Sequence, residues 1–485
     1  MSDQPLSRAR EFSDLPPYYL MLSFWGEKYR NYFYSLCLPS LLSPNNLPLL
    51  QHVRGSKLVI STTTEDWTVL RRTPLFQLLS TYVEPYFIDI GFPPPEVPIQ
   101  LHMSEGHLRA ARKAYEDRAL AGFLAPDLVV SDGLLSTCIS HAASGKKAVL
   151  AQALRFSMEP VLSTLSRHGF LKPDEPMTLP PRFLGALATE ALHSEILRYD
   201  FESRYFADYP IWSYWRVNGR ACLVMHTVSW ALLLGSYEDM ARYSDDFLHA
   251  DTIDGFYVFR NFAHLRDTGE MHMITDSDEA LLMSLTPEAE MNFPLRERPV
   301  NGLHRTGHRK RLVSVQRFLT ADVVDPFRRW AYQIPSFIHG DDLDAESART
   351  ASKSVAITAA ALALEVSPLP NRVPLPWLPE WGRRALISIA DALIIPILGT
   401  LPRFYLRLTL RLVSPMLVRS IVRRLVHKGK GPACRRAPRS IADTLIIPIL
   451  GTLPRFYLRL TLRLVPRPLV RSIVYRLAHR VRASS

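Results

Sequence analysis

Short apolar runs of strand length alternate with segments of helical spacing over the first 154 residues, and this alternation limits the possible folds more than any other feature. The strand-like runs lie at 18–25, 56–63, 85–92, 127–132 and 147–154. The helix-like segments lie at 27–42, 66–83 (with Asp66 as the expected N-cap), 104–123 and 134–144. Because strands that alternate with helices form βαβ units, we expect an α/β body with a mostly parallel sheet and flanking helices.

The rest of the body continues less regularly. Residues 160–210 have a helical pattern, and further apolar runs follow at 222–228, 255–262 and 271–278. An Ala-rich segment at 345–365 predicts the last helix of the body. The stretch 367–382 holds five prolines, which exclude a helix interior and a central strand. We therefore expect a body at 1–365, a Pro-rich linker at 366–382 and a tail at 383–485.

The tail contains a near-identical duplication. Residues 388–413 and 440–465 differ at one position in 26, with a period of 52. Two copies are too few for a solenoid, which needs three or more to bury a continuous core. The duplication therefore predicts a repeated functional segment attached to the body.

The positive charge of the chain belongs to this tail. Residues 381–485 hold 21 Lys and Arg but two acids, whereas residues 1–380 carry a net charge of −7. The body therefore shows no sign of a nucleic-acid-binding surface, and no nucleic-acid partner is expected. The four cysteines are far apart in sequence, which argues against a disulfide scaffold or a zinc ribbon and fits a reducing compartment.

Acidic residues recur just after the apolar runs of the body. Glu65 follows the second run, Asp132 the fourth, and Asp254 lies before a glycine in the segment that leads to the run at 255–262. His226 lies near the end of the run 222–228. Ligands of open α/β sheets bind at the carboxyl ends of strands, so these side chains are candidates for a polar site. A single strand-end acid also often serves as a turn or cap residue.

The run 271–278 ends in Asp-Ser-Asp, the strongest of these signals. Asp276 and Asp278 can direct two carboxylates at one point, an arrangement that suits Mg²⁺ or Mn²⁺ shared with phosphates. Such an ion neutralises the charge that develops on a diphosphate leaving group. The alternative is that Ser277 and Asp278 cap a helix that begins at Glu279.

Standard nucleotide and hydrolase motifs are missing from the sequence. It contains neither GxGxxG after the first strand nor GxxxxGK[ST], and no GxSxG, which disfavours Rossmann dehydrogenases, P-loop ATPases and α/β-hydrolases. The segment HRTGH (304–308) spaces two histidines at i and i+4, but Gly307 weakens the helix that would align them for zinc. We expect a basic surface loop there.

Three segments, FWGEKYRNYFYSLCLPSLLSPNNLPLL (24–50), VISTTTEDW (59–67) and PDLVVSDG (126–133), resemble bacterial glycosyltransferase-like proteins of the GT-A type. The resemblance implies a nucleotide-diphospho-sugar transferase-like fold. Its Asp-x-Asp motif would correspond to Asp276 and Asp278 by sequence, or to Asp132 by its place after an early strand. The chain departs from the pattern in having one acid in SDG and a late DSD.

This resemblance implies transfer of a sugar from a nucleotide-diphosphate donor to an unknown acceptor. Asp276 and Asp278 would hold the divalent metal, either Mg²⁺ or Mn²⁺. Glu65, Asp132, Asp254 and His226 would contact the donor, and no residue is assigned as catalytic. The alternative function is a non-catalytic, membrane-associated scaffold or interaction protein with a degenerate transferase fold.

Each tail repeat combines an apolar stretch with regularly spaced arginines. The stretch 385–401 is 17 residues long and contains an Asp and a Pro, so it is short for a spanning helix. Arg403, Arg407 and Arg411 share one stripe of a helix, as in interfacial helices, although LRLTLRLV also fits a strand. We expect 383–485 to bind an anionic membrane surface. A helical hairpin packed on the body is the alternative.

The expected location follows from these features. The polar N-terminal segment argues against a cleaved secretory signal. Anionic lipids of the cytoplasmic leaflet attract basic segments. We therefore expect a cytoplasmic protein, peripheral on the inner face of a membrane.

Overall fold

The computed structural model describes residue 12 and residues 14–203, 206–240, 262–290, 305–321 and 324–364. The chain divides into a compact unit, Met1–Val366, and a second unit, Ser367–Ser485; every described residue belongs to the first. Asp254, the linker and the basic tail lie outside the described residues. Within the described ranges, no helix is both long enough and apolar enough to span a bilayer.

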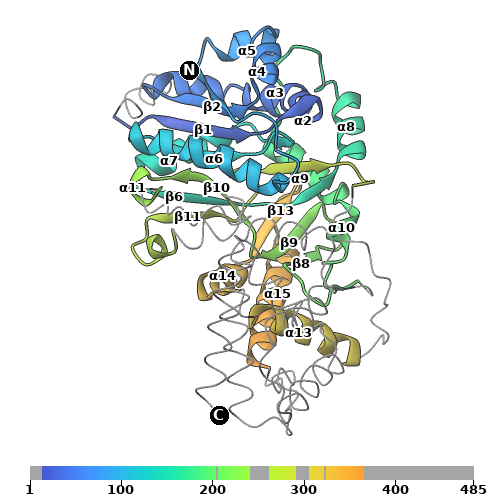
Figure 1. Ribbon diagram of the computed structural model, residues 1–485. Helices are drawn as coiled ribbons and strands as arrows, with labels where there is room; N and C mark the ends of the chain where they lie inside the picture. Colours follow the sequence, from blue (N-terminus) through green and yellow to red (C-terminus); the bar gives the residue numbers. More distant parts are fainter. Residues whose placement is uncertain are drawn as a thin grey trace, which may run out of the picture. The chain divides into compact units, whose positions relative to one another are not determined.

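A mixed seven-stranded sheet forms the centre of the described unit (Figure 1). Its spatial order is β11 (Met271–Ile274), β6 (Ala148–Gln152), β10 (Trp230–Gly235), β4 (Leu120–Leu124), β1 (Tyr18–Ser23), β2 (Lys57–Thr62) and β3 (Glu84–Asp89). β1 is parallel to β2 and β4, β2 to β3, and β6 to β11. β10 is antiparallel to both of its neighbours. The expected α/β class is confirmed, with a sheet that is mixed.

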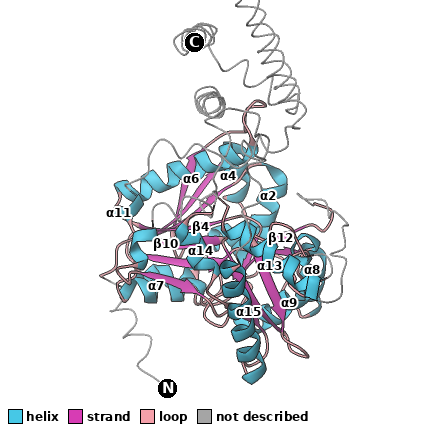
Figure 2. Cartoon of the chain, turned by 90° about the horizontal axis from the view of Figure 1, so that it is seen from below, coloured by secondary structure: helices cyan, strands magenta, loops and turns pink. Residues whose placement is uncertain are grey.

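Helices cover both faces of this sheet because its central strands are apolar on both faces, as parallel strands in α/β proteins are. Tyr19 and Met21 of β1 pack with one cluster of apolar side chains, which includes residues of α6. Leu20 and Leu22 pack on the other face with residues of α7. Figure 2 shows α6 and α7 on opposite sides of β10. The flanking helices are α2 (Gly26–Tyr32), α3 (Leu38–Leu41), α4 (Thr64–Leu70), α5 (Pro74–Leu79), α6 (Ile99–Glu116), α7 (Leu134–Ala143), α11 (Tyr237–Met240) and α14 (Pro326–Tyr332).

One glycine allows α6 to approach the sheet closely. A Cβ atom at Gly106 would lie 2.1 Å from Oγ of Ser23 and 3.0 Å from Cβ of Ser61. The Ser61 hydroxyl instead donates a hydrogen bond to the Gly106 carbonyl at 2.8 Å. A larger residue would therefore separate the helix from β1 and β2.

Two three-stranded sheets complete the unit. One has the order β5 (Leu128–Val130), β12 (Leu282–Thr286) and β7 (Arg155–Ser157), and the other β13 (Ser336–His339), β9 (Cys222–Thr227) and β8 (Trp212–Arg216). The helices around them are α8 (Met158–Arg167), α9 (Pro181–Glu190), α10 (Ser194–Leu197), α13 (Arg305–Leu319) and α15 (Ala345–Ala363). β11 belongs to the seven-stranded sheet and β12 to a three-stranded sheet, so the turn between them joins these two sheets.

Two predicted helices of the N-terminal half differ from the structure. The helix expected at 104–123 ends at Glu116, and residues 120–124 form β4 instead. Arg118 turns the chain with a φ of 54°, and pairing with β1 outweighs the local helical pattern. The helix expected at 66–83 is two helices, α4 and α5, separated by residues 71–73 before Pro74. The N-cap of α4 is Thr63, not Asp66, because the Thr63 hydroxyl accepts a hydrogen bond from the Asp66 amide.

Two alternatives weighed from the sequence are wrong. No helix begins at Glu279, because residues 282–286 form β12 between two other strands. The described part of the HRTGH segment, residues 305–308, is not a loop, since α13 begins at Arg305 and runs through Gly307. A glycine costs a helix only about 1 kcal/mol relative to alanine, which the rest of α13 offsets.

Candidate functional site

The turn Thr275–Glu279 follows the carboxyl end of β11 and lies against β13. The Phe337 amide donates to the Thr275 carbonyl at 2.7 Å, and the Ser277 amide donates to the Phe337 carbonyl at 3.0 Å. The His339 amide in turn donates to Oγ of Ser277 at 3.0 Å. This backbone pairing fixes the register of β13 against the turn and places His339 beside Asp276.

Asp276, Asp278 and His339 offer ligand atoms that all lie within 4.8 Å of one another. Nε2 of His339 lies 2.7 Å from Oδ1 of Asp276, and the same oxygen accepts the Asp278 amide at 2.8 Å. The imidazole is buried, whereas the two carboxylates are partly exposed. The structure therefore brings the two predicted metal residues together and adds a histidine to them.

The hydrogen bonds of His339 define which of its nitrogens faces the carboxylates. Nδ1 lies 2.7 Å from the Asp341 carbonyl, and because a carbonyl only accepts, Nδ1 must carry a proton. Nε2 therefore faces Asp276 and is the nitrogen through which His339 can bind a metal ion. Metal-binding histidines are commonly oriented by such a hydrogen bond from the other ring nitrogen.

Basic side chains already compensate part of this negative charge. Arg182, in the first turn of α9, forms ion pairs with Asp278 and with Asp342. Its guanidinium competes with a cation for Asp278. Two carboxylates and one imidazole fit Mn²⁺ better than Mg²⁺, which prefers oxygen ligands alone. The group thus fits a divalent metal, with Arg182 as a competitor.

A second candidate position lies at the same edge of the seven-stranded sheet, where the carboxyl ends of the neighbouring strands β1 and β4 lie. The chain passes from β1 to β2 and β3 on one side of β1, and then places β4 on the other side. Such a reversal of strand order is where open α/β sheets bind ligands, outside the carboxyl ends of the strands. β6 and β10 separate β4 from β11, so this point lies about 14 Å or more from the end of β11 at about 4.8 Å per strand.

Asp66 organises the loops at this point. Its buried carboxylate accepts hydrogen bonds at 2.7 Å from the Gly26 amide, from Nη1 of Arg30 and from the Thr63 hydroxyl. Gly26 has a φ of 80°, which a residue with a side chain adopts only with strain. Asp66 thus links the loop after β1 to the loop after β2, and its oxygens are used within the protein.

Asp127 follows β4 and lies on the other side of this point. Its Oδ2 accepts a hydrogen bond from the Ser284 hydroxyl at 2.8 Å, and its carbonyl accepts the Leu285 amide at 2.9 Å. Burial raises the pKa of the Asp127 carboxyl, against the opposing charges of Arg155 and Lys28. A raised carboxyl pKa at a strand end is a feature of functional sites. Sequence reasoning assigned Asp127 to the start of a strand and missed it.

The remaining predicted residues have separate surroundings. Glu65 is exposed in the first turn of α4. The Asp132 carboxylate accepts the Asn45 amide at 3.0 Å and its side-chain Nδ2 at 2.7 Å. His226 is buried, with Nδ1 2.8 Å from the Tyr332 carbonyl and Nε2 2.8 Å from Oγ of Ser354. Burial lowers the pKa of His226 to about 4, so its imidazole is neutral and both nitrogens contact protein groups.

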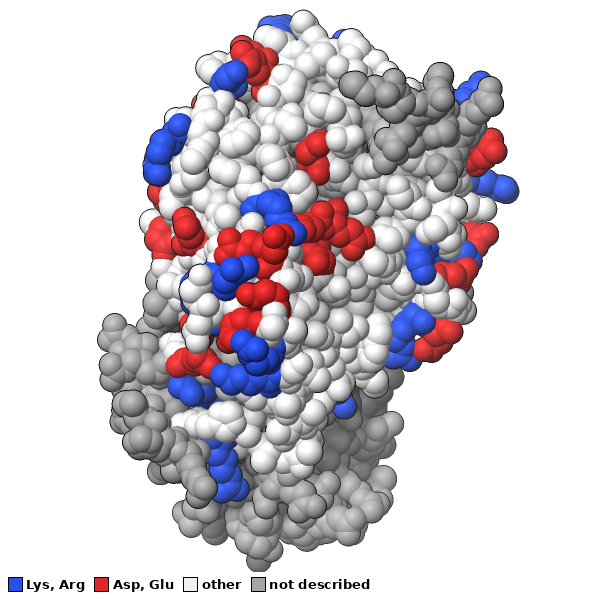
Figure 3. All heavy atoms as spheres, turned by 180° about the vertical axis from the view of Figure 1, so that it is seen from behind, with Lys and Arg blue, Asp and Glu red and all other residues white. Residues whose placement is uncertain are grey.

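Charge on the visible surface is balanced over short distances. Figure 3 shows acidic and basic side chains interleaved in a band across one face of the described unit. Among the ion pairs of the described residues, Arg220 lies 3.6 Å from Asp341 and 3.8 Å from Asp344. On this face, the described residues therefore form mixed ion pairs instead of one patch of a single sign.

Comparison with known proteins does not assign the chain to a family. No family model matches it, and no curated protein matches it.

Proposed function

We propose that the body binds a nucleotide-diphosphate sugar and transfers its sugar to an acceptor. The observation that carries this proposal is the reversal of strand order between β1 and β4, because open α/β sheets commonly bind ligands outside the carboxyl ends of the strands at such a reversal. The loops held by Asp66 and the carboxyl group of Asp127 flank this position. The resemblance of residues 24–50, 59–67 and 126–133 supports it from the sequence, because these segments include the loops that follow β1 and β2 and residue 127, which follows β4.

The reaction breaks the bond between the anomeric carbon and the diphosphate oxygen, so negative charge develops on the leaving diphosphate. Asp276, Asp278 and His339 would hold a divalent ion, which supplies neutralisation of that charge. β4 and β6 are both antiparallel to β10, and β11 is parallel to β6, so β4 and β11 run in the same direction. Their carboxyl ends therefore lie at the same edge of the sheet. In a donor bound in an extended conformation along this edge, the nucleoside would lie at the reversal of strand order and the diphosphate would extend toward these metal ligands.

Calorimetric titration of the full chain with UDP and GDP, with and without Mn²⁺, tests this function. We expect one of the two nucleotides to bind, and Mn²⁺ to strengthen the binding. Asp276→Asn removes a carboxylate ligand and should reduce the effect of Mn²⁺ by roughly tenfold or more, or about 1.4 kcal/mol.

Asp267→Asn is the matched control, because it makes the same change of charge on an exposed residue before the amino end of β11. It should leave nucleotide binding unchanged. Absence of binding by either nucleotide would contradict the transferase and favour the non-catalytic scaffold.

We further propose that residues 383–485 attach the protein to the anionic inner surface of a membrane. The support lies in the sequence, namely the apolar stretch and the arginine stripe of each copy and the charge of the tail. Linking two weak membrane-binding segments raises avidity, since the second binds at high effective concentration. Sedimentation with liposomes tests this attachment.

A further inference from the structure

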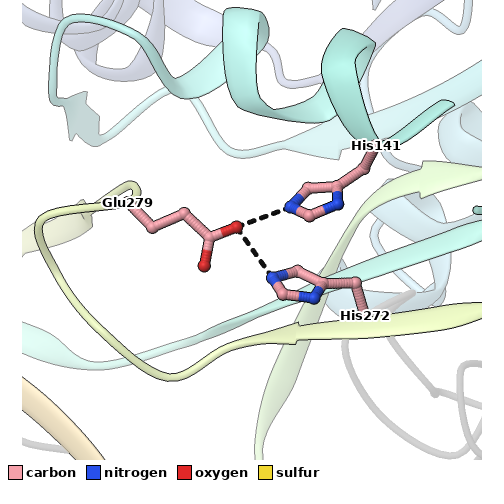
Figure 4. Close-up of side chains that lie close together, drawn as sticks. All are labelled: His141, His272 and Glu279. Atoms are coloured by element: carbon pink, nitrogen blue, oxygen red, sulfur yellow. Dashed lines mark hydrogen bonds and ion pairs between the residues drawn. The ribbon is translucent and has the colours of Figure 1, made fainter. Parts of the chain in front are cut away.

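Two histidines and a glutamate converge at a place that the proposed transfer does not use. His141 lies on α7, His272 on β11 and Glu279 in the turn that follows β11. Oε1 of Glu279 lies 2.6 Å from Nε2 of His141 and 2.7 Å from Nε2 of His272. Figure 4 shows both imidazole rings directed at this single oxygen from two different elements.

The rings themselves are stacked. Their centroids are 3.8 Å apart, with an angle of 24° between the planes. The two Nε2 atoms and the Glu279 carboxylate oxygen lie within 4.8 Å of one another, close enough to share one metal ion once the stacked rings tilt apart.

Local contacts hold the three side chains in place. The Thr137 hydroxyl donates a hydrogen bond to the Glu279 carbonyl at 2.9 Å. Thr137 and His141 are four residues apart on α7 and therefore share a helix face. His272 is fixed by the pairing of β11 with β6, in which it faces Val149. Thus α7, β11 and the turn held by the Thr137 hydrogen bond fix the positions of the three side chains.

In the part of the chain that the structure describes, these rings are the only basic partners of the Glu279 carboxylate. Among the described residues, its ion pairs are with His141 and His272, whereas Asp278 of the same turn pairs with Arg182. The side chains of His141, Glu279 and His272 are 22%, 28% and 29% exposed, so an ion can reach them from solvent. A cation at this position therefore displaces neither a lysine nor an arginine.

We propose that His141, His272 and Glu279 bind one Zn²⁺ ion. Two imidazoles and one carboxylate are a known ligand set for zinc with an open fourth position, which a water molecule fills. Tetrahedral bonds of about 2.1 Å place ligand atoms about 3.4 Å apart, so each contact must open by less than about 1 Å. The ion would join α7, β11 and the turn that also bears Asp276 and Asp278.

Zinc titration of the full chain after treatment with a chelator tests this site. Calorimetry should show a Zn²⁺ site that the Asp276→Asn variant retains, and Co²⁺ in its place should give visible absorption bands of a tetrahedral or five-coordinate ion. His141→Ala, His272→Ala and Glu279→Gln should each weaken zinc binding by roughly 100-fold or more. Loss of a residue that only orients a metal ligand already costs up to roughly 100-fold.

Two control variants distinguish zinc binding at this site from zinc binding by other residues of the chain. His52→Ala removes an exposed histidine elsewhere and should not alter zinc binding. Asp276→Asn should also retain it, although this variant is expected to reduce the effect of Mn²⁺ on nucleotide binding. Failure of the zinc site and failure of the transferase are therefore distinguishable.

Zinc affinity that is unchanged in the double variant His141→Ala/His272→Ala would overturn the proposal. If that variant does not fold, the thermal unfolding of the Asp276→Asn chain, in which the other group of metal ligands is weakened, decides. Its Tm should rise with Zn²⁺ and not with an equal concentration of Mg²⁺, because an ion bound to the folded state stabilises it. A Tm that does not respond to Zn²⁺ would also overturn the proposal.

Discussion

Nε2 of His339 lies 2.7 Å from Oδ1 of Asp276, although 63 positions separate the two residues in the sequence. The contact joins β13 of one small sheet to the turn after β11 of the large one. Because Nδ1 donates to the Asp341 carbonyl, Nε2 is the nitrogen available to a metal ion held by Asp276 and Asp278.

His339→Gln should therefore weaken Mn²⁺ binding by roughly tenfold or more, because glutamine offers no imidazole nitrogen at this position. The concentration of free Mn²⁺, measured by electron paramagnetic resonance, checks this expectation. His168→Gln, a change on an exposed residue, is the control. Equal Mn²⁺ affinity in the two variants would remove His339 from the metal site.

Asp66 and Glu65 are adjacent in sequence, but we expect substitution of Asp66 to reduce stability and substitution of Glu65 to reduce nucleotide binding. Asp66→Asn breaks a buried ion pair with Arg30 and should lower the free energy of unfolding by about 3 kcal/mol. Glu65→Gln alters an exposed residue and should change that free energy by less than about 0.5 kcal/mol, while it weakens nucleotide binding. Urea unfolding and calorimetric titration measure the two effects. A stability loss in Glu65→Gln, or none in Asp66→Asn, would contradict this assignment.

Acid should destabilise the body through a buried histidine. Burial lowers the pKa of His107, which lies on α6 beside Phe123, to about 4, whereas an unfolded histidine has a pKa of about 6.5. The unfolded state therefore binds the proton first as the pH falls. Above about pH 6.5, His107 does not reduce the free energy of unfolding. As the pH falls from about 6.5 to about 4, proton binding by His107 in the unfolded state should lower that free energy by about 3 kcal/mol in total.

Urea unfolding at several pH values in this window checks the His107 prediction. His107→Gln cannot titrate and should reduce the pH dependence, whereas His52→Gln, on an exposed residue, should not. An identical pH dependence in His107→Gln and the unaltered chain would show that another group causes the loss.

The sequence predicted strands well where an apolar run is bounded on both sides by polar residues. β1, β2, β3, β5 and β6 lie within their predicted ranges apart from one residue at the start of β3. β4 was missed because three residues separate it from the charged helix α6, and its partner β1 lies about 100 positions away. Local periodicity does not contain such long-range pairing.

The candidate site was predictable only as far as its residues are neighbours in sequence. Asp276 and Asp278 could be found because they lie two positions apart after an apolar run. His339 comes from another sheet, and no local pattern indicates it. His226 ends an apolar run as expected, but the contacts with Tyr332 and Ser354 that bury it depend on the packing of α14 and α15.

Deleting residues 440–485 should strongly reduce sedimentation with anionic liposomes, because one copy of the repeat then remains. Residues 1–366, which form a compact unit, should stay in the supernatant. High salt should release only part of the full chain, since it screens charge but not apolar insertion. Equal behaviour of the full chain and of 1–366 would end the membrane proposal.

Binding of a nucleotide diphosphate where the strand order reverses can be measured by hydrogen exchange of the full chain with and without nucleotide. UDP or GDP should slow exchange in the loops after β1, β2 and β4, at residues 24–27, 63–66 and 125–128, because a bound ligand suppresses local opening. Unchanged exchange in all three loops at saturating nucleotide would contradict the account.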